Sequence, residues 1–453
     1  MKKTVVIGSG ESGFGAALLA QKQGHRVFVS DAGAIAAEKK AVFKKRGIGF
    51  EEGTHTIAEL LAADTVVKSP GIPYVHPIVV KLKAAGIPVV DELEFAFGYS
   101  QGKVIAITGT NGKTTTTLLI HHLLQAAGLE VGLAGNVGQS WALQLCEGDR
   151  DWWVLEVSSF QIEGLVKFRP RIAVLLNITP DHLDRYNNDL SLYAATKVQL
   201  TNAMQPEDHF IYYDSDANIR LALAHKKSQP AALPYGLEAS PARRAHVAAG
   251  NLRVTTDAGE WSWPIEDMAL KGTHNLANSL AAVLAATTAG VPATTLGPAL
   301  RTFVNAAHRM EWVAAINGIQ FVNDSKGTNV DATAFALEAY DSPLIWIAGG
   351  VDKGNDYSQL DTLVQGRVQV LICLGRDNEK LKSAFGGKIP EILETQDIHQ
   401  ALRWALEKGS PGALVLLSPA CASFDLFKNY EDRGNQFKEA VKQLKTAIEN
   451  GES

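Results

Sequence analysis

The chain has 453 residues, of which 46% are hydrophobic and 20% are charged, and its formal net charge is -5. This length exceeds what a single hydrophobic core organises, so two to four domains are expected. The composition is that of a globular protein, and the acidic balance without a long basic run argues against a nucleic-acid partner.

The cysteines and the N-terminus bear on location. Cys146, Cys373 and Cys421 are far apart and odd in number, so no disulfide framework follows and a reducing cytoplasm fits best. The N-terminal apolar run is interrupted from Gly8 onward, too early for a signal peptide. No apolar stretch is long enough to span a bilayer, so we expect a cytoplasmic protein without a membrane partner.

Predicted strands alternate with predicted helices, which indicates α/β architecture with parallel sheets. The strands fall into three blocks, and Gly290-Val-Pro292 predicts a helix stop and a hinge before the third. A helix is expected after Ser12, another from Lys113, and a third over 274–289. The predicted strands are 4–8, 26–31, 65–71 and 88–91 in the first block, 103–109, 151–158, 171–179, 209–214, 247–256 and 261–265 in the second, and 319–324, 344–349, 368–375 and 413–418 in the third.

A glycine-rich turn follows the first predicted strand. It reads Gly8-Ser-Gly-Glu-Ser-Gly13, and Asp31 ends the next strand 18 residues beyond Gly13. This arrangement is typical of dinucleotide folds, in which a helix N-terminus faces phosphate and the acid reaches a ribose. A nucleotide site and a tight turn required only for packing are equally compatible with it, and it does not distinguish NAD from another nucleotide.

A second turn is more specific. Gly109-Thr-Asn-Gly-Lys-Thr-Thr-Thr116 follows an apolar strand and opens a helix, although only two residues separate Gly109 from Gly112. Backbone N–H groups of such a loop hold phosphates, while Lys113 neutralises charge and Thr114 reaches Mg²⁺. The alternative is a strand–turn–helix junction with a solvated lysine.

Two metal candidates follow strands of the same block. Glu156 closes one strand and His182 comes just after another. In a parallel sheet both would lie at the edge that carries the phosphate loop, where a carboxylate and an imidazole suit Mg²⁺. A salt bridge for Glu156 and a loop hydrogen bond for His182 are the alternatives. Lys197 lies on a predicted helix, and periodicity alone would make it solvated.

The third block has four polar clusters after apolar segments, where active sites of α/β proteins collect, although each is also compatible with an ordinary turn. They are His308-Arg309, Asn323-Asp-Ser-Lys-Gly-Thr-Asn329, Gly349-Gly-Val-Asp-Lys353 and Ser418-Pro-Ala-Cys-Ala-Ser423.

Several of these segments together resemble the Mur ligases. They are Gly109-Thr-Asn-Gly-Lys-Thr-Thr115, Glu156-Val-Ser-Ser-Phe-Gln161, Asn177-Ile-Thr-Pro-Asp-His-Leu-Asp184 and His274-Asn-Leu-Ala-Asn278. The segment Ser418-Pro-Ala-Cys-Ala-Ser-Phe-Asp-Leu-Phe-Lys-Asn-Tyr-Glu-Asp-Arg-Gly-Asn435 is very similar to the C-terminal signature of the D-glutamate-adding members.

The resemblance implies three α/β domains: a Rossmann-like UDP-sugar domain over 1–92, a central P-loop ATPase-type domain over 93–296, and a dinucleotide-fold-like, amino-acid-binding domain over 297–453. It implies a ligase that joins UDP-N-acetylmuramoyl-L-alanine to D-glutamate through an acyl phosphate, with ATP, two Mg²⁺ ions and CO₂ as a lysine carbamate. We expect a monomer.

Residue roles carry over from the same resemblance. Catalysis falls to Lys113, His182 and Lys197, and the metal ligands are Thr114, Glu156, His182 and carbamylated Lys197. The ATP-binding residues are Gly109, Thr110, Asn111, Gly112, Lys113, Thr114, Thr115, Asn278, Arg309 and Asp324. The substrate-binding residues are Ser12, Asp31, Ser69, Gly71, Asn136, Ser158, Gln161, Lys326, Thr328, Lys353, Ser423 and Tyr430.

One departure and three rivals remain. Asp31-Ala-Gly33 lacks the Thr-Arg pair that some relatives carry there, so uracil contacts are not implied.

Folylpolyglutamate synthase shares the central architecture, but its phosphate loop lies near the N-terminus. An NAD-dependent dehydrogenase would leave the second phosphate loop without a role, and a nucleotide-binding scaffold would not release phosphate. Whether His182 or a nearby carboxylate deprotonates the incoming amine is open.

Overall fold

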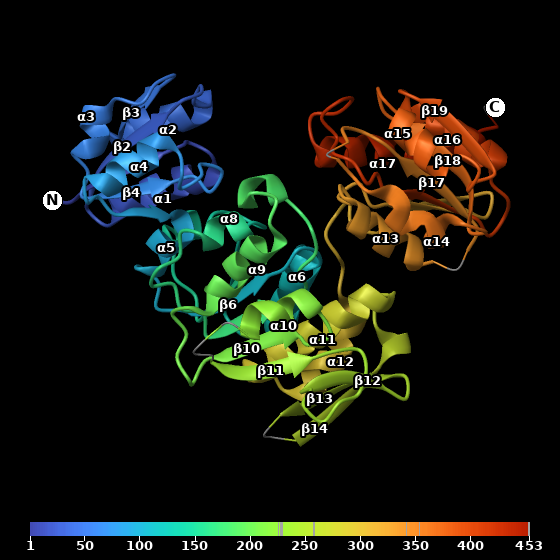
Figure 1. Ribbon diagram of the computed structural model, residues 1–453, viewed down its shortest axis with the longest axis horizontal. Helices are drawn as coiled ribbons and strands as arrows, with labels where there is room; N and C mark the ends of the chain where they lie inside the picture. The colour runs from blue at the N-terminus through green and yellow to red at the C-terminus, as the bar shows by residue number, and fades with distance from the viewer. Residues whose placement is uncertain (225, 227–229, 257–258, 341, 353, 452–453) are drawn as a thin grey trace. The chain divides into compact units, whose positions relative to one another are not determined.

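The computed structural model describes all residues except 225, 227–229, 257–258, 341, 353 and 452–453 (Figure 1). The described residues form three separate β-sheets, and mixed α/β architecture is confirmed. The chain divides into two compact units. Unit 1 comprises residues 1–268 and 277–303, and holds the first two sheets. Unit 2 comprises residues 269–276 and 304–453, and holds the third.

The first sheet is parallel throughout, with strand order β3-β2-β1-β4-β5. Its central strand β1 is buried along its whole length, as expected for a strand covered on both faces. The strands are β1 Lys3–Ile7, β2 Arg26–Asp31, β3 Gly49–Glu52, β4 Thr65–Lys68 and β5 Val89–Asp91, and the helices are α1 Glu11–Lys22, α2 Ala37–Arg46, α3 Ile57–Leu61, α4 Pro77–Ala84 and α5 Glu92–Phe97.

The second sheet has the order β14-β13-β12-β11-β10-β9-β6-β8-β7. It is parallel from β7 to β12, and β12, β13 and β14 then run antiparallel. Ala249 and Gly250, both with positive φ, form the two-residue turn between β12 and β13, and such a turn joins only antiparallel strands. This end of the sheet therefore departs from the parallel pattern, and the turn divides the β segment expected over 247–256 into two strands. The strands are β6 Lys103–Thr108, β7 Val131–Gly135, β8 Trp152–Glu156, β9 Ile172–Leu175, β10 His209–Tyr213, β11 Ala231–Tyr235, β12 Ala245–Ala248, β13 Asn251–Thr256 and β14 Gly259–Pro264.

The helices that accompany this sheet include the predicted one from Lys113. The helix expected over 274–289 is α11, and it ends before Gly290, whose φ is 94°. The predicted helix stop is confirmed, but the predicted hinge was wrong, because residues 277–303 all belong to unit 1. The helices are α6 Lys113–Ala126, α7 Trp141–Leu145, α8 Ser159–Ile162, η1 Leu183–Tyr186, α9 Leu190–Val198, η2 Gln199–Thr201, α10 Ala217–Ala224, η3 Ile265–Asp267, α11 Thr273–Thr288 and α12 Ala293–Thr302.

The third sheet has the order β15-β16-β20-β17-β18-β19. β15 is antiparallel to β16 across the turn at Asn317 and Gly318, and the other pairs are parallel. The strands are β15 Glu311–Ile316, β16 Ile319–Asn323, β17 Leu344–Ala348, β18 Val368–Leu374, β19 Glu391–Thr395 and β20 Leu414–Leu417, and the helices are α13 Val330–Glu338, η4 Tyr357–Leu360, α14 Asp361–Val364, α15 Glu379–Phe385, α16 Ile398–Lys408 and α17 Tyr430–Glu449.

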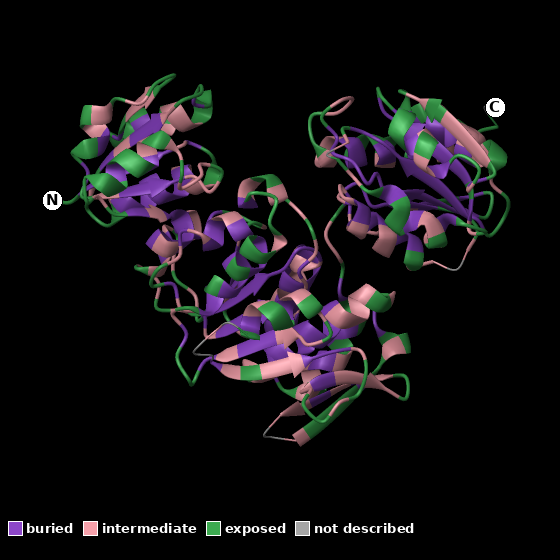
Figure 2. Cartoon of the chain, viewed as in Figure 1, coloured by how far each residue is buried: buried purple, intermediate pink, exposed green. Residues whose placement is uncertain are grey.

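The first two sheets share one continuous core. Leu19 of α1 and Phe95 of α5 belong to the same buried cluster as Trp141 of α7 and Val104 of β6. Figure 2 shows the buried strands, with helices that are buried on one side and exposed on the other. The third sheet has a separate apolar cluster on each face, in which Trp346 and Ile347 point to opposite sides. The core shared by the first two sheets thus accounts for their grouping in unit 1.

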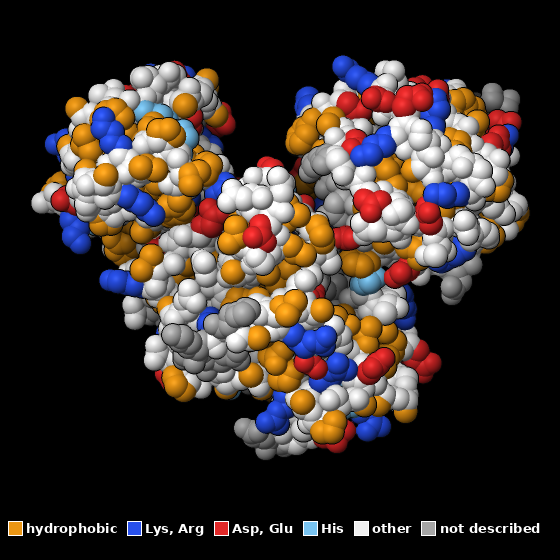
Figure 3. Space-filling model, viewed as in Figure 1, with side chains coloured by type: hydrophobic (Ala, Val, Ile, Leu, Met, Phe, Trp, Pro, Cys, Tyr) orange, Lys and Arg blue, Asp and Glu red, His pale blue; other side chains and the backbone are white. Residues whose placement is uncertain are grey.

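The surface has no single charge sign. On the face in Figure 3, Lys and Arg side chains are interspersed with Asp and Glu side chains. Within the described part of the chain, none of the helices combines the length and apolarity that crossing a membrane requires.

Candidate active site

The phosphate loop connects β6 to α6, as the sequence predicts. Gly109 and Gly112 have φ values of 155° and 81°, a region that side chains with a Cβ rarely adopt. Thr110, Asn111, Thr114 and Thr115 are all buried, the last two in the first turn of α6. The loop therefore presents backbone N–H groups and a helix N-terminus, which together attract phosphate.

Lys113 and Lys197 meet at one backbone oxygen of this loop. The Lys113 ammonium donates to the carbonyl oxygens of Gly109 and Thr110, over 2.9 and 2.6 Å. The Lys197 Nζ donates to the same Gly109 oxygen over 2.8 Å and lies 4.4 Å from the Tyr193 ring centroid. Lys197 is only 2% exposed. Burial, and then the charge of Lys113, hold the pKa of Lys197 well below its usual range. The expectation from periodicity alone, that Lys197 is solvated, was therefore wrong.

Asn177, which follows the neighbouring strand β9, holds the loop by hydrogen bonds. Its Oδ1 accepts hydrogen bonds from the backbone N–H groups of Thr110 and Asn111, over 3.1 and 2.8 Å, and its Nδ2 donates to the Asn111 oxygen over 3.0 Å. Asn177 lies within the motif 177–184, but no role was predicted for it. An amide side chain directly after a buried strand, at the edge that holds the loop, was the available signal.

Asn278 lies against the other side of the loop. A Cβ on Gly112 would collide with its Oδ1, so the helix α11 and the loop are in direct contact. Asn278 is buried and belongs to unit 1, together with the phosphate loop. The structure therefore brings this predicted ATP-binding residue to the predicted site.

Glu156 ends β8 in a buried position, with 2% exposure. Its Oε1 accepts a hydrogen bond of 2.9 Å from Asn136 Nδ2. Its Oε2 is buried, and no donor among the described residues contacts it. A buried carboxylate oxygen without a partner is costly unless a cation or another ligand is bound there. The salt-bridge alternative has no support among the described contacts.

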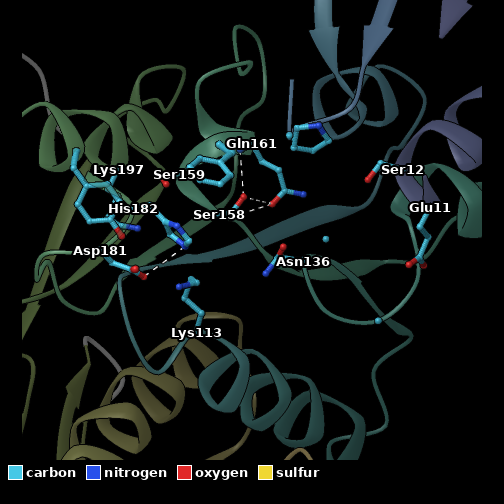
Figure 4. A pocket seen from close by; sticks show the side chains of 16 residues that line it. Glu11, Ser12, Lys113, Asn136, Ser158, Ser159, Gln161, Asp181, His182 and Lys197 are labelled. Carbon is cyan, nitrogen blue, oxygen red and sulfur yellow. Dashed lines mark hydrogen bonds and ion pairs between the residues drawn. The ribbon is translucent and has the colours of Figure 1, made fainter. Parts of the chain in front are cut away.

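His182 is the N-cap of η1 and has a left-handed backbone conformation with φ 51°. Its side chain is 48% exposed and its Nε2 lies 3.7 Å from Asp181 Oδ2. Figure 4 shows Lys113 pointing toward this pair from α6, with Asn136 in the middle of the site. Phe160 packs edge-on against the imidazole, with ring centroids 5.2 Å apart.

One cavity of unit 1 lies beside these groups and has a volume of about 430 Å³, but Glu156, Asn177 and Asn278 are not among its described lining residues. Of the predicted residues it brings together Lys113, His182 and Lys197 with Ser12, Gly71, Asn136, Ser158 and Gln161. The sequence analysis missed other lining residues: Glu11, Pro70, Gly135, Gly138, Ser159, Phe160, Asp181 and Tyr193. Several of them lie within quoted motifs, but their type alone gave no reason to choose them.

Ser158 and Gln161 also have a local structural role. Ser158 is the N-cap of α8, and its Oγ accepts from the Gln161 N–H over 3.3 Å. The Gln161 Oε1 accepts from the Ser158 N–H over 2.9 Å, so the two form a capping box. The box fixes the orientation of both side chains at the cavity wall (Figure 4).

Of the remaining first-block residues, Ser69 and Asp31 are not among the described cavity-lining residues. Ser69 packs against Gly8, where a Cβ would collide with its Oγ. Asp31 accepts two hydrogen bonds of 2.6 Å from Ser9, through the backbone N–H and the hydroxyl, and one of 2.8 Å from the Gly33 N–H. Burial raises the pKa of Asp31, but these hydrogen bonds outweigh it and hold the pKa below its usual value. Asp31 therefore holds the glycine-rich turn in place.

Unit 2 contains the other predicted residues. Asp324 follows β16 and is buried, and its Oδ2 accepts from Ser418 Oγ over 2.8 Å. Burial raises the pKa of Asp324 to about 6, against the opposing charge of Arg309. Lys326 Nζ lies 5.6 Å from the Tyr430 ring centroid, and Ser423 is buried. The Thr328 N–H donates to the Lys326 oxygen over 2.9 Å. Lys353 lies outside the described residues.

Arg433 is a buried residue of unit 2 that the sequence analysis left without a role. Its guanidinium donates to the Ser325 Oγ and oxygen, each over 2.9 Å, and to the oxygens of Gly349 and Cys421, over 3.3 and 3.4 Å. Desolvation by burial lowers its pKa to about 10. One side chain thus joins the segments that follow β16, β17 and β20.

A magnesium ion fits the unit 1 cavity by the chemistry of its donors. No group of three or more His, Cys, Asp or Glu side chains among the described residues could hold a metal alone. The buried Glu156 Oε2 has no described donor, and a carboxylate oxygen of this kind suits a hard cation. His182 lines the cavity, whereas Glu156 is joined to it through the lining residue Asn136, and Thr114 is not among the described lining residues.

The chain matches three family descriptions in succession. They are the MurD N-terminal domain over residues 3–76, the Mur ligase middle domain over 107–286, and the Mur ligase, glutamate ligase domain over 308–421. A UDP-N-acetylmuramoylalanine--D-glutamate ligase from Christiangramia forsetii is 46% identical over 443 residues, 98% of this chain and 100% of that protein. The chain belongs to the Mur ligase family. The protein of the same name from Porphyromonas gingivalis is 46% identical to this Mur ligase, over 97% of this chain and 98% of that protein.

Solved structures agree on the fold of this Mur ligase. UDP-N-acetylmuramate-alanine ligase MurC from Thermotoga maritima has a TM-score of 0.61 at 18% identity, covering 98% of this chain and 100% of that chain. A pseudomurein peptide ligase type C from Methanothermus fervidus has a TM-score of 0.63 at 18% identity, with the same coverage. At this identity the likeness concerns the fold alone.

Proposed function

We propose that this Mur ligase joins UDP-N-acetylmuramoyl-L-alanine to D-glutamate with ATP, as a cytoplasmic monomer in the synthesis of peptidoglycan precursors. The observation that supports this most is the 46% identity, over nearly the whole of both chains, to relatives that bear the name of that activity. The site in unit 1 supports it independently, because Lys113 of the phosphate loop lines the cavity and the neighbouring Glu156 has a carboxylate oxygen without a described donor, as an ATP-dependent ligase that binds Mg²⁺ requires.

The chemistry explains why ATP is required. A carboxylate is a poor electrophile, so the L-alanine carboxylate first attacks the γ-phosphoryl group and forms an acyl phosphate. The D-glutamate amine then attacks that carbonyl carbon, and inorganic phosphate leaves. Two anions approach each other in the first step, which demands fixed positive charge and oriented backbone dipoles.

Lys113 is proposed to supply that fixed charge. Its ammonium is held by the oxygens of Gly109 and Thr110 and points toward the cavity (Figure 4). The N-terminus of α6 and the loop N–H groups add partial positive charge at the same place. Mg²⁺, when bound through Glu156, His182 and Thr114, would neutralise further phosphate charge.

Lys197 is proposed to carry a carbamate. Its lowered pKa makes the neutral amine available. The amine nitrogen attacks the carbon of CO₂ and releases one proton, which leaves an anionic carbamate. The carbamate would replace the second ammonium beside Lys113 with two oxygen donors, which a hard metal cation prefers.

Residues of unit 2 are proposed to bind the amino acid and part of the nucleotide. Lys326, Lys353 and Ser423 offer cations and a hydroxyl for the two carboxylates of D-glutamate, with Thr328 and Tyr430 beside them. Arg309 and Asp324 are the proposed ATP-binding residues of unit 2, and Asn278 is one of those of unit 1. Ser12, Asp31, Ser69 and Gly71 are proposed to face the UDP moiety.

The proposed domain limits are 1–92, 93–296 and 297–453. Helix α12 spans the second limit, and its residues group with unit 1 as far as Phe303.

Phosphate release by the purified protein tests the function. Release should require ATP, Mg²⁺, UDP-N-acetylmuramoyl-L-alanine and D-glutamate together. Equal turnover with L-glutamate, D-alanine or L-lysine would contradict the amino-acid assignment. Tight binding of NAD in competition with the UDP-linked substrate would instead favour a dehydrogenase.

A further inference from the structure

Arg185 connects two segments of unit 1 that are far apart in the sequence. It lies in η1, three residues after His182. Its Nη2 and Nη1 donate to the backbone oxygens of Pro70 and Gly71, over 3.3 and 3.4 Å. The turn that follows β4 in the first sheet is therefore bonded to the loop that carries His182 in the second.

Glu163 holds the guanidinium in place from a third segment. Its two oxygens accept from Arg185 Nε and Nη2, over 3.0 and 2.8 Å. The side chains of Arg185 and Glu163 are only 12% and 19% exposed. A bidentate pair with so little solvent access is better fixed than an exposed ion pair.

The guanidinium also lies over the Phe160 ring. The Arg185 Cζ is 4.3 Å from the ring centroid, and the same ring packs against His182. Pro70, Gly71, Phe160 and His182 all line the cavity, and Arg185 is absent from the described lining residues. Arg185 therefore contacts the cavity walls from behind.

We propose that Arg185 is a positioning residue that fixes the Pro70–Gly71 turn against the His182 wall, so that a UDP-linked substrate finds both walls of its site already in place. The proposal rests on the function proposed above, which assigns this cavity to that substrate. Arginine suits the task because one planar fork pairs with a carboxylate, donates to two carbonyls and stacks on a ring at once. Lysine offers no comparable fork.

The test compares Michaelis constants in the full-length protein. Arg185→Met should raise the KM for UDP-N-acetylmuramoyl-L-alanine about tenfold, because two hydrogen bonds from a charged donor are lost. The KM for ATP should change by less than about twofold, because the phosphate loop makes no described contact with Arg185. Arg185→Lys should recover only part of the loss. Calorimetric binding of the same substrate without ATP should weaken in parallel.

Matched variants separate positioning from general stability. Glu163→Gln keeps the shape of the partner but removes its charge, and should raise the same KM by a smaller factor. Arg150→Met removes an exposed ion pair with Glu130 and should leave every KM unchanged. If Arg185 served only the stability of the fold, Arg185→Met would instead lower the thermal midpoint and raise the KM for the UDP-linked substrate and for ATP alike.

Two outcomes overturn the proposal. One is an unchanged KM for the UDP-linked substrate in Arg185→Met, or in both Arg185→Lys and Glu163→Gln if the methionine variant does not fold. The other is an equal rise in KM for ATP. Wild-type protein without ligase activity would refute the proposed function instead, whatever the variants do.

Discussion

Lys113 and Lys197 donate to the same backbone oxygen, that of Gly109, over 2.9 and 2.8 Å. Two ammonium groups at one acceptor repel each other, and burial adds to the cost of charging Lys197. Of the two lysines, Lys197 is therefore the one whose charged form is disfavoured.

The first prediction concerns that second lysine. Lys197→Ala should lower kcat about a hundredfold or more, since it removes the proposed carbamate that holds the cation beside the transferred phosphoryl group. Circular dichroism should show an intact fold. Added formate or acetate should restore part of the activity by supplying the missing oxygens.

Lys197→Arg is the matched control, because it keeps the cation and cannot form a carbamate. Short carboxylates should not rescue it. Full activity in either variant, or an unmodified ammonium at this position in a metal-loaded crystal, would be incompatible with the carbamate.

A second prediction concerns Glu156 and Asn136. Glu156→Gln should raise the Mg²⁺ concentration needed for half-maximal activity at saturating ATP, because the Oε2 that lacks a partner is replaced by an amide NH₂. Asn136→Ala should lower the affinity for Mg²⁺ by a factor of about 10 to 100, since it removes the donor that orients Oε1. A Mg²⁺ titration of phosphate release measures both, with the exposed Glu130→Gln as control. An unchanged titration in Glu156→Gln would exclude this residue as a ligand.

The third prediction uses two glycines at opposite ends of α6. Gly112 and Gly128 have φ values of 81° and 75°, so alanine at either position costs about 1–2 kcal/mol in backbone strain. A Cβ at Gly112 would also collide with Asn278, whereas one at Gly128 meets no atom within 4 Å. Gly112→Ala should therefore be the less stable variant in chemical denaturation, and only it should lose ATP affinity. Equal free energies of unfolding would show that the Asn278 contact is not tight.

The fourth prediction is a pH dependence of stability. Glu92 is fully buried; its Oε1 accepts from Ser140 Oγ over 2.8 Å and from the Ala142 N–H over 2.6 Å. Burial raises its pKa from 4.5 to about 7, and the charges of Asp91 and Glu11 add to the rise. A carboxyl group whose pKa is higher in the folded than in the unfolded state stabilises the fold at low pH. This contribution to the free energy of unfolding, about 3 kcal/mol here, is lost as the pH rises from about 4.5 to about 7.

Glu92→Gln should remove this part of the pH dependence. The variant should match the wild type near pH 5 and exceed it in thermal midpoint near pH 8, because the amide oxygen still accepts both hydrogen bonds. Glu147→Gln, at an exposed site, should follow the wild type at both pH values. A variant that is less stable than the wild type at pH 8 would argue against the raised pKa.

Much of this architecture is readable from the sequence, because buried parallel strands are uninterrupted apolar runs. The strand before Gly109 and the helix from Lys113 are examples, and the motifs after the strands locate the cavity. Short strands with polar residues escaped notice: Gly49–Glu52 and Glu391–Thr395 have half-buried patterns typical of sheet edges. Their place depends on neighbours that local sequence does not reveal.

Residues that support the site were harder to identify than those that line it. Arg433 lies inside a quoted motif and Arg185 directly follows one, yet an arginine among polar residues is usually solvated. Only the fold shows that Arg433 is buried among backbone oxygens and that Arg185 has Glu163 beside it. Lys197 was the opposite case, since periodicity made it a surface residue and the family resemblance made it functional.

The capping of α7 by Glu11 and Glu92 has a consequence for protein engineering. Glu11 Oε1 accepts from the Ser140 N–H over 3.1 Å, so carboxylates of the first block satisfy a helix terminus of the second. The two blocks also share one apolar core. A chimaera that exchanges only residues 1–92 between relatives would combine mismatched halves of this contact, whereas one that transfers residues 139–145 along with them would keep it intact.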